Sequence, residues 1–250
     1  MLKAVRVLAE NGPVRVELAR SEGRLVVVKR LVGFHPVLER RLAREAEVVR
    51  KLDHPGILPL LWVRDGVLVY PFLPGVNLAD ALRAGPLPWR RARRIGVEAL
   101  RALDYAHGHG IIHHDVKPGN LVQRGERTIL LDFGFAKDLA LSSITAISSA
   151  MGTPNYMAPE QFGGVRDDPR SDIYAVGAVL YHAVAGEPPY GREVLRMLAG
   201  ERPELAPVPA RARALADWIR TALAPAPSAR FQSAAEMLAA VPDERAQVAR

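Results

Sequence analysis

The chain has 250 residues, of which 49% are hydrophobic and 24% are charged, and its formal net charge is +7 at pH 7. This balance is typical of a globular protein with a sizeable core, so disorder along most of the chain is excluded. The chain has no cysteine, which excludes a disulfide scaffold and is compatible with a reducing compartment.

The sequence contains no stretch that is typical of a membrane span. The apolar, charge-free residues 173–186 form a stretch shorter than the roughly 18–20 residues that a span needs, so we interpret them as a buried core helix. Arg6 and Glu10 interrupt the apolar residues at the N-terminus, which argues against a signal peptide. We therefore expect a cytoplasmic location and no membrane partner.

Basic residues exceed acidic ones by a small margin, 34 against 27. The densest basic run comprises Arg90, Arg91, Arg93 and Arg94. No aromatic residues are interleaved with this run, so we interpret it as the solvated face of a helix and expect no nucleic-acid partner.

The first third of the chain has the patterns of strands around one helix. Asn11-Gly12 lies between two alternating segments, which predicts a hairpin. Apolar residues recur at helical spacing between residues 38 and 52, which predicts a helix there. The predicted strands cover residues 3–8, 14–18, 24–31 and 67–72.

Helical patterns dominate after Pro74-Gly75. The predicted helices cover residues 78–83, 88–108, 171–185, 211–223 and 233–241. This change of character divides the chain into a small strand-rich part, residues 1–73, and a larger helical part, residues 74–250.

Two charged residues fall on faces that are otherwise apolar. Strand alternation places Lys29 on one face with Val27 and Leu31. Helical spacing places Glu45 on one stripe with Leu42. Because a lone buried charge costs several kcal/mol, the two residues together predict an inward ion pair.

Three short segments carry polar residues in a specific order. Residues 113–120 read HHDVKPGN, residues 132–134 read DFG, and residues 152–160 read GTPNYMAPE. With the strand Lys and the helix Glu before them, they resemble the protein kinase family, specifically bacterial enzymes similar to eukaryotic Ser/Thr kinases. The resemblance implies an α+β, bilobal protein-kinase-like fold, with a small strand-rich N-lobe that has one main helix and a larger, mostly helical C-lobe.

The resemblance also implies roles for the polar residues, with ATP and Mg²⁺ as cofactors. Asp115 is expected to orient the attacking hydroxyl, and Lys117 to neutralise the transferring phosphoryl group. Asn120 and Asp132 are expected to bind Mg²⁺, which prefers oxygen ligands. By the same resemblance, Lys29 holds the α and β phosphates and Glu45 steadies it.

Further positions follow from the resemblance alone. Glu160 and Arg230 match a buried pair of the family, Asp172 matches a residue that anchors the catalytic loop, and Thr153 matches a bridge to Asp115. The nucleotide-binding residues implied are Gly12, Val16, Val27, Tyr70, Pro71, Leu73 and Val122.

The chain departs from the family pattern at three places. The glycine-rich loop keeps only Gly12, followed by Pro13, which has no N–H to donate to a phosphate. We expect a tight hairpin tip and a weaker phosphate clamp there. Val27 is bulkier than the family's Ala and narrows the adenine slot. His114 replaces an Arg, so we expect activity to depend less on phosphorylation of Thr145, Ser148 or Ser149.

The function predicted from these motifs is a Ser/Thr protein kinase that acts on protein hydroxyls and phosphorylates itself. The degenerate loop leaves open a pseudokinase that acts as a binding module. A small-molecule kinase is a third reading, which the segment at residues 152–160 disfavours because it serves peptide docking. The histidines at 107, 109, 113 and 114 leave open a transition-metal site.

Overall fold

The N-terminal residues form one antiparallel sheet. In the computed structural model, which describes residues 2–133, 154–191, 193–203 and 212–243, five strands pair in the order β1-β2-β3-β5-β4. The predicted strands are all present, and β4 is an additional three-residue edge strand. The strands are β1 (Leu2–Asn11), β2 (Val14–Ser21), β3 (Arg24–Leu31), β4 (Trp62–Arg64) and β5 (Val67–Pro71).

The register of the sheet decides which side chains share a face. Val16 pairs with Lys29 across β2 and β3, and Val27 pairs with Tyr70 across β3 and β5. Directly opposed residues point to the same face, so these four side chains lie on one side of the sheet. The opposite side has its own small core of Ala19, Val26, Val28 and Val69.

The first hairpin closes tightly, as the sequence predicts. Asn11 pairs with Val14, which leaves only Gly12 and Pro13 at the tip. Gly12 has φ of 57°, a conformation that glycine adopts without steric cost. The tip therefore offers few backbone N–H groups to a ligand.

Helix α1 (Pro36–Val49) packs against the sheet through its apolar stripe. Proline stands in its first turn, where a missing N–H costs no hydrogen bond. Leu42, Ala46 and Val49 join the same buried cluster as Leu68 of β5. Glu45 lies on this stripe and is also buried.

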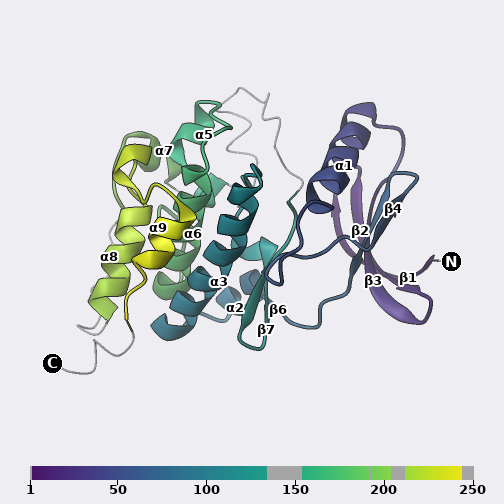
Figure 1. Ribbon diagram of the computed structural model, residues 1–250, viewed down its shortest axis with the longest axis horizontal. Helices are drawn as coiled ribbons and strands as arrows, with labels where there is room; N and C mark the ends of the chain where they lie inside the picture. The colour runs from purple at the N-terminus through teal and green to yellow at the C-terminus, as the bar shows by residue number, and fades with distance from the viewer. Residues whose placement is uncertain (1, 134–153, 192, 204–211, 244–250) are drawn as a thin grey trace.

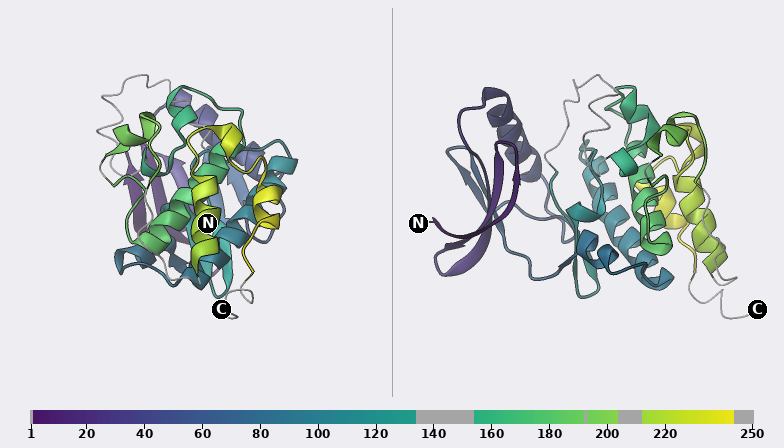
Figure 2. Two further views of the ribbon diagram at one scale, coloured as in Figure 1. Left: turned by 90° about the vertical axis from the view of Figure 1, so that its left-hand side faces the viewer. Right: turned by 180° about the vertical axis from the view of Figure 1, so that it is seen from behind.

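The other described residues form a mostly helical part, which lies at the opposite end of the molecule from β1 (Figure 1). A second view from behind shows the same separation between the sheet with α1 and the other helices (Figure 2). The helices are α2 (Leu78–Arg83), α3 (Trp89–Gly108), α5 (Pro159–Phe162), α6 (Arg170–Ala185), α7 (Val194–Leu198), α8 (Arg213–Ala222) and α9 (Ala234–Ala239).

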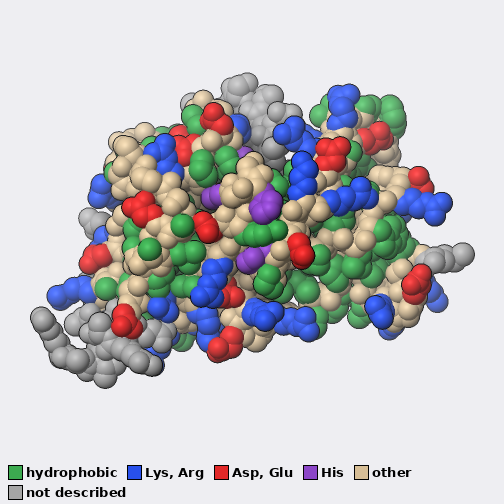
Figure 3. Space-filling view, in the orientation of Figure 1, with side chains coloured by type: hydrophobic (Ala, Val, Ile, Leu, Met, Phe, Trp, Pro, Cys, Tyr) green, Lys and Arg blue, Asp and Glu red, His purple; other side chains and the backbone are tan. Residues whose placement is uncertain are grey.

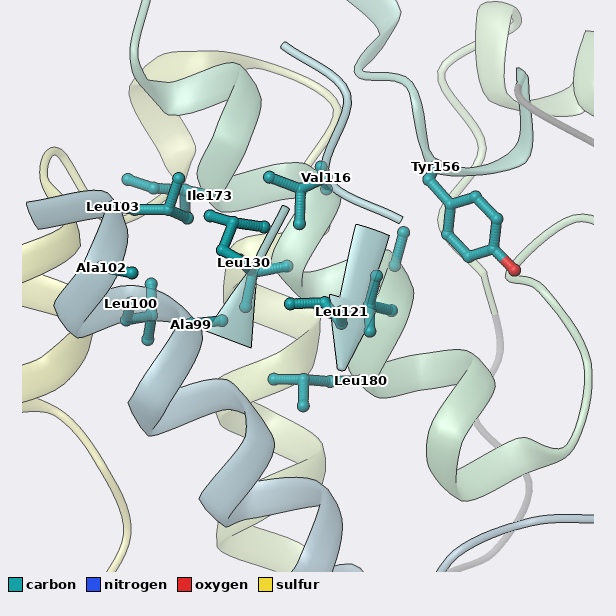
Figure 4. Close-up of a cluster of buried hydrophobic side chains, with 14 of the residues drawn as sticks. Ala99, Leu100, Ala102, Leu103, Val116, Leu121, Leu130, Tyr156, Ile173 and Leu180 are labelled. Atoms are coloured by element: carbon teal, nitrogen blue, oxygen red, sulfur yellow. The ribbon is translucent and has the colours of Figure 1, made fainter. Parts of the chain in front are cut away.

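Helix α6 is the centre of the helical part. Most of its residues from Ser171 to Ala183 are buried, as expected for a helix that is apolar all round. Its Leu180 and Ile173 lie in a cluster with Leu100 and Leu103 of α3 (Figure 4). No helix among the described residues has both the length and the apolar character needed to cross a membrane.

A small three-stranded sheet lies in the helical part and was not predicted. Its strands are β6 (Val76–Asn77), β7 (Leu121–Arg124) and β8 (Arg127–Leu130), in the order β6-β7-β8. Strands of two to four residues are too short to show a clear alternation, although Gly125 marks the turn between two of them. The hairpin of β7 and β8 positions two of the candidate site residues.

The last two predicted helices are longer than the observed ones. Helix α8 begins at Arg213 rather than 211, and α9 begins at Ala234 rather than 233. At α9 the reason is capping, because the Ser233 side chain accepts a hydrogen bond from the backbone N–H of Glu236. The strand predicted at 67–72 ends one residue early, at Pro71, which has no N–H to donate to the ladder.

Candidate active site

Lys29 bridges two carboxylates that come from distant parts of the chain. Its Nζ lies 2.8 Å and 3.0 Å from the two oxygens of Glu45 on α1, and 2.5 Å from Oδ1 of Asp132. Both Lys29 and Glu45 are buried. The ion pair predicted from the two misplaced charges is therefore present, and it also includes Asp132.

The electrostatics of this cluster follow from one cation between two anions. Burial alone lowers the pKa of Lys29, but the carboxylates of Asp132 and Glu45 outweigh burial and raise it. Burial raises the pKa of Glu45, and Lys29 only partly offsets this effect. For Asp132 the balance is reversed, since Lys29 outweighs burial and lowers its pKa. Asp132 thus keeps its negative charge facing the cluster.

A second polar cluster forms within the segment that reads HHDVKPGN. The Lys117 ammonium donates to Oδ2 of Asp115 at 2.7 Å. The amide Nδ2 of Asn120 donates to the backbone oxygen of Asp115 at 2.8 Å and to its Oδ2 at 3.2 Å. These bonds fix the Asn120 amide so that its Oδ1 is turned away from Asp115.

The β7–β8 hairpin brings the two clusters together. Asn120 directly precedes β7, and Asp132 follows β8 by two residues. Because the two strands are antiparallel, the start of one lies beside the end of the other. The backbone N–H of Leu131 donates to the oxygen of Asn120 at 2.8 Å, which holds Asp132 next to the second cluster.

Asp172 anchors the backbone at the start of the segment that reads HHDVKPGN. Its carboxylate is fully buried and accepts hydrogen bonds of 2.8 Å from the backbone N–H groups of His113 and His114. It also pairs with Nε2 of His107 at 2.9 Å. Burial raises the pKa of Asp172, but His107 and the neighbouring donors outweigh it and lower the pKa. The acid therefore stays ionised inside the core.

His113 is a structural residue of the loop. Its Nε2 bonds the oxygen of Leu131 at 2.8 Å, and its Nδ1 accepts from the N–H of Asp115 at 3.2 Å. This pattern requires the neutral tautomer with hydrogen on Nε2. The ring also packs edge-on against Phe133, with ring centroids 4.7 Å apart.

The histidines do not form a metal site. No group of three or more His, Cys, Asp or Glu residues suited to a metal ion occurs among the described residues. The ring nitrogens of His113 are both used in the loop, and His107 pairs with Asp172. His109 bonds the backbone oxygen of Tyr105. The transition-metal reading is therefore not supported.

His114, which stands where the family has Arg, is partly buried beside the same anchor. Burial lowers its pKa, so the side chain is neutral at physiological pH. Its Nδ1 is buried, with no hydrogen-bond partner among the described residues. Its φ of 64° lies in the left-handed region, as does that of Asp132, also 64°. Such conformations cluster at functional sites, where the surrounding structure holds them.

Only some of the expected nucleotide-binding residues lie on the face of the sheet that carries Lys29. Val16, Val27 and Tyr70 share the face that carries Lys29. Pro71 ends β5, and Leu73 follows it. Val122 of β7 belongs to the smaller sheet, where it pairs with Asn77 of β6. Except for the buried Tyr70, these side chains are half-buried; Gly12 is exposed at the hairpin tip.

The buried pair predicted from the resemblance is present. Arg230 donates to both oxygens of Glu160 at 2.6 Å and 2.8 Å, and its side chain is completely buried. It also donates to the backbone oxygens of Ala224, Pro225 and Arg170. This single guanidinium therefore ties α5, α6 and the segment after α8 together.

Two contacts near the site were not predicted. The Tyr70 hydroxyl donates to Oε1 of Glu45 at 2.7 Å. Gln161 accepts from the N–H of Ala158 and donates to the oxygen of His114 at 3.4 Å. The resemblance had assigned Tyr70 to the nucleotide pocket, but it gives no information on what its hydroxyl contacts. Thr145, Ser148, Ser149 and Thr153 lie outside the described residues.

Comparisons with known proteins agree with this arrangement. The chain matches the protein kinase domain family over residues 10–240. It is 35% identical over 256 residues to the serine/threonine-protein kinase PknB of Mycolicibacterium smegmatis, covering 93% of this chain and 41% of the relative. It is 36% identical over 242 residues to the serine/threonine-protein kinase PknJ of Mycobacterium tuberculosis, covering 88% and 40%.

A solved structure shows the same fold. The crystal structure of the PknI kinase domain of Mycobacterium tuberculosis, a point mutant, superposes with a TM-score of 0.73 at 29% sequence identity, covering 99% of this chain and 95% of that one. The fold and the site define a protein kinase domain, and this chain belongs to that family. The chain spans about two fifths of the length of the curated relatives, 41% and 40%. Protein kinases as a class use ATP and Mg²⁺.

Proposed function

We propose that the chain is an ATP-dependent protein kinase that transfers the γ-phosphoryl group to Ser or Thr hydroxyls of proteins, including its own. The observation that carries the proposal is the bridge of Lys29 Nζ between Glu45 and Asp132. A buried cation that is held by two carboxylates, one of them beside Asn120, is suited to phosphate oxygens and a hard metal ion.

The residues present fit Mg²⁺. The Asp132 side chain keeps about a third of its surface exposed, 32%, so a cation can reach its carboxylate. The bonds of Asn120 to Asp115 are made by its amide nitrogen, so its amide oxygen is the atom that could bind a metal. Asp132 and Asn120 would hold the metal through oxygen atoms, the ligands that Mg²⁺ prefers. The ion would neutralise negative charge on the β and γ phosphates.

Each remaining polar residue has a defined task in this proposal. Asp115 accepts the hydrogen bond of the attacking hydroxyl and takes its proton as the new bond forms. Lys117, which is 2.7 Å from Asp115, stabilises the charge of the transferring phosphoryl group. Lys29 binds the α and β phosphates, and Glu45 orients it. The half-buried residues Val16, Val27, Pro71, Leu73 and Val122, the buried Tyr70 and the hairpin tip at Gly12 surround the nucleotide.

We place the boundary between the lobes at residues 73 and 74, as N-lobe 1–73 and C-lobe 74–250. This boundary is supported by the order of the strands along the chain. The last strand of the larger sheet, β5, ends at Pro71, and the next strand, β6, begins at Val76 and belongs to the smaller sheet. A cytoplasmic location is part of the proposal, because ATP is abundant there.

Protein substrates are favoured over nucleic acid. The basic run on α3 is used internally: Arg91 bonds Gln123, Arg93 bonds the oxygen of Pro242, and Arg94 pairs with Glu126. On the face drawn in Figure 3, Lys and Arg side chains are spread among acidic and neutral ones rather than gathered into one patch.

The test is transfer of radiolabelled phosphate from Mg²⁺-ATP to the protein itself and to a generic basic protein, followed by identification of the phosphorylated amino acid. We expect phosphoserine or phosphothreonine from the wild type. Asp115→Asn removes the proton acceptor and should lower kcat at least about 100-fold. Asp132→Asn removes a metal ligand and should abolish transfer.

The matched control is Asp104→Asn, which makes the same chemical change at an exposed position of α3. It should leave transfer at the wild-type rate. Labelling that persists in Asp115→Asn and Asp132→Asn would contradict the assigned roles.

The tight hairpin tip favours a second candidate, a non-catalytic binding module. The tip consists of Gly12 and Pro13 alone, and Pro13 has no N–H for a phosphate oxygen. The same assay separates the two functions: a wild type that transfers no phosphate in the presence of Mg²⁺-ATP supports the binding module.

A further inference from the structure

Tyr70 of β5 contacts the Glu45 carboxylate of α1 through its hydroxyl. Its hydroxyl donates to Oε1 of Glu45 at 2.7 Å, the same oxygen that Lys29 reaches at 3.0 Å. The tyrosine and the glutamate are both buried, with 6% and 2% of their surfaces exposed. Glu45 therefore accepts three hydrogen bonds, two from the ammonium and one from the phenol.

The phenol matters because Lys29 is shared. The ammonium is only 2.5 Å from Asp132, so the two carboxylates compete for one cation. A buried carboxylate that loses part of its partner needs another donor to remain in place. Tyr70 is a neutral donor whose hydroxyl bonds Glu45 rather than Asp132. It can keep this bond when phosphates bind Lys29.

The two ends of this hydrogen bond belong to different elements. Tyr70 is fixed within the sheet, because β5 pairs with both β3 and β4. Glu45 is carried by α1, which packs on the sheet through its apolar stripe, and its carboxylate meets the sheet through Lys29 of β3 and Tyr70 of β5. The bond therefore sets the position of the carboxylate relative to Lys29. Burial raises the pKa of Tyr70, which keeps the hydroxyl protonated as a donor.

We propose that Tyr70 is a positioning residue that acts through Glu45 to hold the Lys29 ammonium in place for the nucleotide phosphates. This inference rests on the proposed function. It assigns a task to the hydroxyl, separate from the space that the aromatic ring fills.

The first test is Tyr70→Phe, which removes the hydroxyl and keeps the ring. Lys29 meets the α and β phosphates before and during transfer, so its misplacement weakens both states alike. We expect KM for ATP to rise about tenfold while kcat changes less than about twofold, since one hydrogen bond to a charged group is lost. KM for the protein substrate should not change.

The matched control is Tyr105→Phe on α3. The Tyr105 hydroxyl accepts a hydrogen bond from the backbone N–H of Asp53 at 3.2 Å, so the same atom is deleted from another site. Its KM for ATP should equal that of the wild type. Melting temperatures of both variants separate a loss of fold from a loss of positioning.

A second measurement does not need catalysis. The dissociation constant of Mg²⁺-ATP is determined for wild type, Tyr70→Phe, Glu45→Ala and the double variant. We expect Tyr70→Phe to weaken binding about tenfold in the wild-type background and to have no effect once Glu45 is Ala, because the hydroxyl acts only through that carboxylate.

Equal affinity of wild type and Tyr70→Phe overturns the inference but leaves the proposed function intact. An effect of Tyr70→Phe that persists undiminished without Glu45 also overturns it, since the hydroxyl would then act directly. A wild type that binds no Mg²⁺-ATP overturns the inference together with the proposed function.

Discussion

At the scale of single residues, Lys29 joins the carboxylates of Glu45 and Asp132. The pair with Glu45 could be predicted from the sequence, whereas the contact with Asp132 could not. Lys29 and Glu45 interrupt apolar faces, and that misplacement is visible in the sequence. The three-way contact with Asp132 joins residues 103 positions apart, and no local pattern contains that information. The contact of the Tyr70 hydroxyl is similar: the register of the sheet fixes the face of the side chain, and the packing of α1 decides what the hydroxyl reaches.

Buried histidines give the molecule a defined response to acid. His182 of α6 accepts a hydrogen bond through Nδ1 from the Tyr156 hydroxyl, and the two atoms are 2.6 Å apart. Burial lowers the pKa of His182 from its ordinary value of 6.5, despite the opposing charge of Glu187. Burial acts in the same direction on His54 and His114. The unfolded chain therefore binds protons more readily than the folded one in mild acid.

We predict that these histidines do not change the free energy of unfolding above their unfolded-state pKa of about 6.5. Below that pH, the free energy of unfolding falls as the pH drops toward the lower pKa of the folded state. His182→Asn keeps an oxygen acceptor for Tyr156 and removes the titration. When the pH is lowered from about 7.5 to 5.5, the melting temperature of His182→Asn should fall less than that of the wild type. An equal loss in both proteins would show that His182 does not contribute.

At the scale of elements, long periodic segments were predictable and short ones were not. The helices α3 and α6 agree with the sequence-based prediction to within one or two residues. The strands β6, β7 and β8 escaped prediction because their positions are set by each other and by the residues around Gly75. These short strands place Asn120 beside Asp132, so the least predictable elements position the site.

Close packing of α6 against α8 depends on a glycine. A Cβ at Gly177 would lie 2.8 Å from Cβ of Ala222 and 3.2 Å from Cγ of Leu223. By contrast, a Cβ at Gly108, the last residue of α3, meets no atom within 4 Å. Replacing each glycine by alanine therefore compares a site where the added methyl group meets a neighbouring helix with a site where only the helix propensity changes.

We predict that Gly177→Ala lowers the free energy of unfolding by about 1–3 kcal/mol, because the added methyl group forces the two helices apart. Gly108→Ala should instead raise it by up to about 1 kcal/mol, since alanine has less conformational entropy to lose. Denaturant titration of both variants measures the difference. A Gly177→Ala variant as stable as Gly108→Ala would contradict the proposed contact.

At the scale of the whole molecule, the sequence was sufficient for the division into a strand-rich and a helical part. It was not sufficient for the contacts that join remote segments. The Arg230–Glu160 pair was expected from the family resemblance, not from any periodicity in this chain. Its geometry adds three backbone oxygens as partners of the guanidinium.

We predict that Arg230→Met lowers the free energy of unfolding by about 3–5 kcal/mol, because Glu160 and the backbone oxygens lose a buried donor. The control is Arg220→Met, which breaks the exposed pair with Asp217 on α8. That change should cost about 1 kcal/mol or less. Similar costs for the two variants would mean that the buried pair does not hold the helical part together.

The central claim is that Lys29, Asp115, Asn120 and Asp132 converge on one bound nucleotide. A crystal structure with Mg²⁺ and a non-hydrolysable ATP analogue tests it most directly. We expect the metal on oxygens of Asp132 and Asn120, the Lys29 ammonium on the α and β phosphates, and the γ phosphate facing Asp115. A nucleotide bound away from these residues, or a metal held by other groups, would contradict the account.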